Sequence, residues 1–305
     1  MARFLKNILL FSLLIVAGLA ACEVNSRRQP HPLKYQDEYI CKRGTEISRL
    51  IIGPSSIWWG VDPAMFPNDS VFTIAYNGQH ISRSLHALEH YLPYMPNLRE
   101  IVIGILPCTF FDHTDMASKN YEGEIAYAVH SPLAKHPIWS PYNYTIFFPA
   151  NFRQRLLPWK EKQDTMYDGL GHATSSPTHR RSRHWRNSAR WLRSQHVAED
   201  YDFVGYNVAN MCRLLELCRD HGVNVTVVAT PVHSEYTEMI PRPQMALHYS
   251  IIRGLQQDYG FRFRDYSEDS RITDDAFYDV VHLSTDVGAA QFSSIHPDSR
   301  QRPFH

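Results

Sequence analysis

Short runs of β-branched and aliphatic residues recur along the chain and alternate with amphipathic segments. Four of these runs show little alternation between apolar and polar positions, as strands of a parallel sheet covered on both faces require. They are RLIIG at Arg49–Gly53, VFTIAY at Val71–Tyr76, EIVIGI at Glu100–Ile105 and NVTVVAT at Asn224–Thr230. A weaker fifth run, FRFRDY, covers Phe261–Tyr266. The pattern predicts five strands.

The segments between these runs carry apolar residues at helical spacing, as in Ile81–Tyr91 and Asn207–His221. Gly222 follows the second segment and is a suitable helix stop. Strands that alternate with helices indicate an α/β fold, a mostly parallel five-stranded sheet covered by helices in three layers. In such folds ligands bind at the carboxyl ends of the strands. Functional residues are therefore expected just after strands.

One long interval, residues 107 to about 200, breaks the alternation between the third and fourth strands. Tyr, Trp, Pro, His and Arg are frequent in it, and irregular connections of this length usually form a lid or a binding surface. Its segment THRRSRHWR, residues 178–186, could hold an anionic or sugar-bearing polymer through charge and stacking. A solvated basic face explains the same residues.

The first residues have the order of an export signal, with Arg3 and Lys6 ahead of an apolar run. The run ends in Leu-Ala-Ala-Cys at Cys22, which resembles a bacterial lipobox, whose cysteine carries the lipid. An uncleaved anchor is the alternative, although the run from about residue 8 to 21 is short for a span of roughly 20 residues. We expect a signal or anchor over 1–21, a polar tether over 22–46 and the α/β domain over 47–305. The domain then lies outside the cytoplasm, in the bacterial cell envelope.

The composition of the chain limits the classes of partner and cofactor that it can be expected to bind. The 305 residues include 44% apolar residues, enough for a sizeable core, and 31 basic against 31 acidic side chains. A balanced charge provides no overall field for nucleic acid. The cysteines and histidines show no zinc-ligand spacing, so we expect neither a metal nor another cofactor.

Candidate chemistry begins with GPSS at the end of the first predicted strand. Ser55 stands two residues beyond Gly53, where the chain must turn into a helix whose first N–H groups could stabilise an oxyanion. A serine at this place can equally well cap the helix. The stretch FYDVVHLSTDVG near the other end places Asp279 three residues before His282. A nucleophilic serine needs a base such as His282, oriented by a carboxylate such as Asp279.

Together, GPSS followed by Gly60-Val61-Asp62-Pro63 and DVVHL followed by glycine resemble the SGNH (GDSL-type) hydrolase superfamily. The likeness is greatest to envelope-anchored members that act in acyl modification of surface polysaccharides. It implies a flavodoxin-like sandwich with Ser55 as nucleophile and with Asp279 and His282 as acid and base. It also implies that Gly78, after the second strand, donates its N–H to the oxyanion.

Other residues near strand ends are candidates for substrate contact. Asn77, beside Gly78, could contact substrate or simply form a tight turn. His233 follows the fourth strand and is either a substrate contact or an ordinary loop residue. The family's third-block asparagine, an oxyanion donor, is not visible, and Thr109 is the nearest polar substitute. Pro54 also departs from the family, because it stands where Asp or Ser is usual and offers no donor.

The sequence thus predicts a serine esterase or O-acyltransferase that acts on acyl esters of an envelope glycan through an acyl-serine intermediate. Water as acceptor would make it an esterase, and a sugar hydroxyl would make it a transferase. A membrane acyltransferase is a possible partner. The alternative is a non-catalytic lipoprotein of the same fold that binds a glycan or such a partner, which Pro54 and the missing asparagine favour.

Overall fold

The computed structural model describes residues 1–28, 30–66, 70–112, 127, 129–134, 167–174 and 185–295. Its centre is one sheet of five strands in the order β2-β1-β3-β4-β5, and every neighbouring pair is parallel. The strands are β1 (Arg49–Ile52), β2 (Val71–Thr73), β3 (Glu100–Ile105), β4 (Asn224–Ala229) and β5 (Arg262–Asp265). The predicted α/β fold with a parallel five-stranded sheet is confirmed, and the long insertion lies between β3 and β4.

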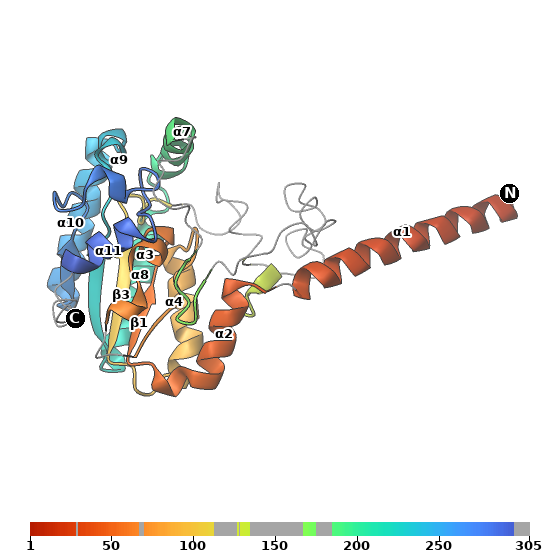
Figure 1. The fold of residues 1–305 in the computed structure, drawn as a ribbon, viewed down its shortest axis with the longest axis horizontal. Helices are drawn as coiled ribbons and strands as arrows, with labels where there is room; N and C mark the ends of the chain where they lie inside the picture. The colour runs from red at the N-terminus through yellow and green to blue at the C-terminus, as the bar shows by residue number, and fades with distance from the viewer. Residues whose placement is uncertain are drawn as a thin grey trace.

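Helices cover both faces of this sheet (Figure 1). They are α2 (Pro32–Arg43), α3 (Ser55–Gly60), α4 (Ile81–Tyr91), α7 (Trp185–His196), α8 (Val204–Asp220), α9 (Ser234–Met239), α10 (Arg242–Tyr259) and α11 (Val287–Ile295). Single 3-10 turns at Gly44–Glu46, Pro63–Met65, Leu92–Tyr94 and Asp274–Ala276 connect some of them.

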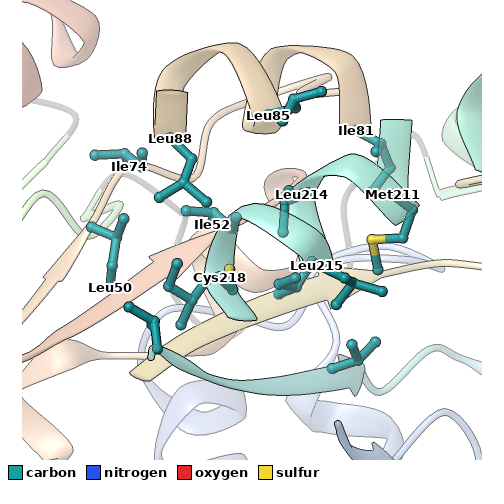
Figure 2. Close-up of a cluster of buried hydrophobic side chains, with 14 of the residues drawn as sticks. Leu50, Ile52, Ile74, Ile81, Leu85, Leu88, Met211, Leu214, Leu215 and Cys218 are labelled. Atoms are coloured by element: carbon teal, nitrogen blue, oxygen red, sulfur yellow. The ribbon is translucent and has the colours of Figure 1, made fainter. Parts of the chain in front are cut away.

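The two faces of the sheet form separate apolar layers because successive strand residues point in opposite directions. Leu50 and Ile52 of β1 pack with α4 and α8, whose inward residues are shown in Figure 2. Ile51, between them, packs on the other face with Ile57 of α3 and with α11. The strand is buried on both sides, which explains why its sequence lacks an alternating pattern.

Two elements differ in length from their predicted bounds. β2 ends at Thr73 rather than Tyr76, although the N–H groups of Ile74 and Tyr76 still donate to the carbonyls of Ile51 and Gly53 at 2.9 and 3.1 Å. α8 begins three residues early, at Val204. The predicted helix Ile81–Tyr91 matches α4, and Gly222 follows α8 with a φ of +67°.

The N-terminal residues depart further from expectation. A helix, α1 (Ala2–Arg28), projects from the body (Figure 1). Residues 32–43, expected to be part of a polar tether, form α2, where Ile40 is fully buried in the core and the Gln36 amide donates to the Ala75 carbonyl at 3.1 Å. Polar composition suggested a tether, but four residues on one side of this helix are buried against the sheet domain.

Candidate active site

The turn between β1 and α3 places Ser55 at the carboxyl edge of the sheet. Gly53 has a φ of +134°, a backbone conformation that L side chains rarely adopt, and a Cβ there would lie 2.8 Å from the Gly104 carbonyl oxygen. The Pro54 carbonyl then accepts N–H bonds from Ile57 and Trp58 at 3.2 Å and starts the helix. Ser55 therefore stands at the positive end of a short helix, as the sequence predicted.

Ser55 meets a histidine from the far end of the chain. Its Oγ lies 2.7 Å from Nε2 of His282, 227 residues away. Nδ1 of the same ring lies 2.9 Å from both carboxylate oxygens of Asp279. With the Nδ1 proton held by that carboxylate, Nε2 is the nitrogen that can accept the serine proton. The three side chains have the geometry that a nucleophile, a base and an orienting acid require.

Asp279 is held in its charged form although it is buried. Burial alone would raise its pKa, but the neighbouring His282 ring and the N–H groups of Val281 and His282 together lower it. Those two N–H groups donate to Oδ1 at 2.8 and 2.9 Å. The Ser188 hydroxyl donates weakly to Oδ2 at 3.4 Å. The carboxylate is thus anchored to its own loop and can orient the imidazole.

Two adjacent tryptophans of α3 have different surroundings. Trp58 is fully buried, and its Nε1 donates to the Gly171 carbonyl at 2.7 Å. Trp59 lies against the His282 ring, with centroids 4.8 Å apart, and lines the adjacent cavity. Packing by Trp59 restricts the orientation of the imidazole.

A cavity of about 610 Å³ opens beside Ser55 and His282. Three further residues singled out from the sequence line it, Asn77, Gly78 and Thr109. Gly78 has a φ of +62°, which the Asn77-Gly78 turn requires. The Thr109 hydroxyl accepts the Leu106 N–H at 2.8 Å, which leaves its own proton available for a ligand.

His233 does not line this cavity. Its Nδ1 accepts the Glu235 N–H at 3.2 Å and caps α9, and its ring lies edge-on to Trp185 and Phe277. The position after β4 suggested a substrate contact, but the chain turns directly into α9 and uses the side chain as a helix cap. The contacts of His233 are thus those of a helix cap and not of the cavity lining.

Several cavity residues were not predicted from the sequence. Trp191, Leu192 and His196 come from α7, at the end of the long insertion, and His80 and Asp112 come from the loops after β2 and β3. His80 and Asp112 follow strands, so the rule that predicted Asn77 could have found them. The α7 residues follow no strand and could be recognised only as part of an aromatic and basic insertion. Most of the basic segment 178–186 lies outside the described residues.

No group of three or more His, Cys, Asp or Glu side chains in the described part of the chain is arranged to hold a metal ion. At the other end of the molecule, α1 contains one stretch, Arg3–Asn25, that is long and apolar enough to cross a membrane. A signal sequence has the same properties. This stretch is longer than the apolar run judged from the sequence, so its length does not argue against an anchor. Cys22 lies within this helix.

One protein-family model matches a part of the chain. Residues 193–286 match the model of the DltD protein family. The matched segment includes Asp279 and His282 but not Ser55, and it covers less than a third of the chain. This match supports the resemblance to the SGNH superfamily. No curated protein sequence matches the chain.

Solved structures resemble the chain at the level of general architecture. A GDSL-like lipase from Bacteroides thetaiotaomicron is 10% identical, with a TM-score of 0.41 over 87% of this chain and 96% of the lipase. A catalytic mutant of an acetylxylan esterase from Geobacillus stearothermophilus is 13% identical, with a TM-score of 0.38 over 86% of this chain and 100% of the esterase. Likenesses this distant assign no substrate.

Proposed function

We propose that the chain is a serine acyl-transfer enzyme of the cell envelope, an esterase or an O-acyltransferase. The observation that carries the proposal is the 2.7 Å contact between Ser55 Oγ and His282 Nε2, with Asp279 on the other ring nitrogen. A helix cap alone would not bring together three such groups from two ends of the chain beside a cavity. The match to the DltD family, which has a role in envelope acylation, supports the envelope setting.

The proposed reaction has two steps. Ser55 attacks the ester carbonyl as His282 takes its proton, and His282 then protonates the leaving alcohol, which leaves an acyl-serine. In the second step His282 removes a proton from water or from a sugar hydroxyl, that oxygen attacks the acyl-serine, and His282 returns the proton to Oγ of Ser55 as the acyl group leaves. The N–H of Gly78 and the hydroxyl of Thr109 are the proposed donors to the oxyanion, with Asn77 as a substrate contact.

The setting is proposed from the N-terminus and the family together. Cys22 as a lipidation site, or α1 as an uncleaved anchor, would hold the domain at the outer side of the membrane. The substrates are then acyl esters of an envelope glycan, with a membrane acyltransferase as a partner that could supply the acyl group.

A fluorophosphonate probe tests the proposal, because it reacts only with an activated serine. We expect labelling of the native chain, no labelling of Ser55→Ala and normal labelling of Ser56→Ala. Ser56 is the matched control, since its side chain is buried beside Ser55 and outside the cavity lining. Absence of labelling in the native chain would favour the alternative, a non-catalytic glycan-binding lipoprotein of the same fold.

A further inference from the structure

Helix α7 forms a firmly held wall of the cavity. Leu192, on its inward face, is 2% exposed and packs with Val232 and Tyr236. Near the start of the helix, the Trp185 indole N–H donates to the Glu235 carboxylate at 3.0 Å, and at the end His196 Nδ1 lies 3.1 Å from the Tyr236 hydroxyl. Both ends are therefore fastened to α9, and the side chains between them have a defined position beside His282.

Trp191 stands next to Leu192 on this wall, yet 52% of it is exposed. It lines the same cavity as Ser55 and His282. A large apolar ring left in water on a well-packed helix contributes nothing to the core, and rigid aromatic side chains lose little conformational entropy when a ligand covers them. Trp191 is therefore available to contact whatever enters the cavity.

The remaining lining indicates what that ligand is. Side chains that can form hydrogen bonds line part of the cavity: Asn77, Gln79, His80, Thr109, Asp112 and His196. The lining also has an apolar side, to which Tyr76, Ile81 and Leu106 belong and which suits an acyl group, but a short acyl group alone would leave most of about 610 Å³ empty. A sugar fits both features, because one face of its ring presents C–H groups that stack on an indole while its hydroxyls need hydrogen-bond partners.

The charge on α7 is compatible with a neutral or anionic glycan. Arg190 and Arg193 are exposed, and the helix contains no acidic residue. Such a helix at a cavity mouth attracts anionic polymers and repels cationic ones.

We propose that Trp191 is the stacking platform for a sugar ring of the glycan that reacts at Ser55. This inference rests on the proposed function and extends it, since it names the residue that selects a glycan over a small ester. Trp191 itself takes no part in the chemistry.

The test compares Trp191→Ala and Trp191→Phe with the native full chain in detergent. The substrates are p-nitrophenyl acetate and O-acetylated xylo-, chito- and manno-oligosaccharides. For an oligosaccharide that the native chain accepts, we expect Trp191→Ala to raise KM about tenfold with little change in kcat, and Trp191→Phe to retain most of the affinity. Hydrolysis of p-nitrophenyl acetate, which carries no sugar ring, should fall by much less than hydrolysis of the oligosaccharide in both variants. Tyr206→Ala is the matched control, because Tyr206 is 48% exposed on α8 and does not line the cavity.

Calorimetric titration with the same oligosaccharides separates this inference from the proposed function. Binding that is lost in Trp191→Ala but kept in Ser55→Ala supports the platform even if the chain hydrolyses nothing. If Trp191→Ala loses activity equally on p-nitrophenyl acetate and on the oligosaccharides, Trp191 has a merely structural role and the inference is overturned. The inference is also overturned if none of the oligosaccharides binds the native chain. In that case fluorophosphonate labelling of Ser55 would still support the proposed function.

Discussion

At the scale of single residues, the candidate site is a meeting of two short motifs. Both could be found in the sequence, because a serine after a strand and an Asp-x-x-His loop are local patterns. Their proximity was implied only by the family resemblance, since a gap of 227 residues is closed by the fold and not by any local pattern. The side chains that pack around these residues, such as the Trp59 ring against His282, could not be predicted from the sequence either, because their contacts depend on the fold.

Replacing Asp279 by Asn isolates the orienting role of the carboxylate. The amide can present its NH₂ group to Nδ1, which favours the tautomer that carries its proton on Nε2 and leaves no base for Ser55. We expect kcat/KM for p-nitrophenyl acetate to fall by about 10³ to 10⁴-fold, as the loss of such an acid costs in comparable triads.

Ser188→Ala is the control for that substitution, because it removes only the weak 3.4 Å bond to Oδ2. Its kcat/KM should stay within about threefold of the native value, because this bond is long and the carboxylate keeps the N–H bonds from Val281 and His282. An Asp279→Asn variant with more than a tenth of the native activity would show that Asp279 does not orient the His282 ring for catalysis.

At the scale of elements, the strands were predictable and their neighbours were less so. The four apolar runs became β1 to β4 because burial on both faces leaves an unmistakable composition. α2 was not predicted because its composition is mostly polar, although four of its residues are buried. α7 was not predicted because the irregular insertion gives no sign of where a helix will pack. The close approaches between elements could not be predicted either, although Gly53, just after β1, and Gly104 in β3 permit one beside the site.

Gly104 allows α3 to lie against β3 at the level of Ser55. A Cβ at this position would lie 2.5 Å from Cβ of Ile57, a contact that only a shift of the helix can relieve. Gly104→Ala should therefore lower the free energy of unfolding by about 1–3 kcal/mol and reduce kcat/KM by displacing Ser55. Urea unfolding and p-nitrophenyl acetate hydrolysis measure the two effects.

Gly254→Ala provides the comparison, since it adds the same methyl group inside α10, where no atom lies within 4 Å of the new Cβ. This variant should be as stable as the native chain or more stable by about 0.5–1 kcal/mol, with unchanged activity. Equal behaviour of the two glycine variants would mean that the approach of α3 to β3 is looser than the structure shows.

At the scale of the whole molecule, the docking of α2 changes how the domain is held. The chain was expected to leave the membrane through a flexible tether up to residue 46, but the segment between α1 and α2 spans only residues 29–31. His31, at its end, accepts the Leu33 N–H, and its Nε2 lies 3.2 Å from the hydroxyl of Tyr76, a residue that lines the cavity. The N-terminal helix is thus joined to the sheet domain close to the candidate site.

The stability of this domain depends on histidines that are buried without charge. Burial lowers the pKa of His248 from 6.5 to about 4, and nearby Asp265 only partly opposes the shift. His31 and His196 are shifted in the same direction, also mainly by burial. Because such a pKa is lower in the folded chain, the unfolded chain takes up a proton first as the pH falls. The stabilisation is complete above pH 6.5 and is lost as the pH falls toward the folded value.

For His248 alone, the loss of folding stability can be estimated from the difference in proton binding between the unfolded and the folded chain. Between pH 6.5 and pH 4 the unfolded chain binds about one more proton at this site than the folded chain, which costs about 1.4 kcal/mol for each pH unit. His248→Gln cannot titrate, so the free energy of unfolding of the native chain should fall relative to this variant by about 2 kcal/mol between pH 7 and pH 5. Urea unfolding of both chains at the two pH values gives the difference directly, and any change in packing caused by Gln cancels. Parallel pH profiles would mean that the His248 ring reaches solvent or an acidic partner, and the α10 packing that buries it would be wrong.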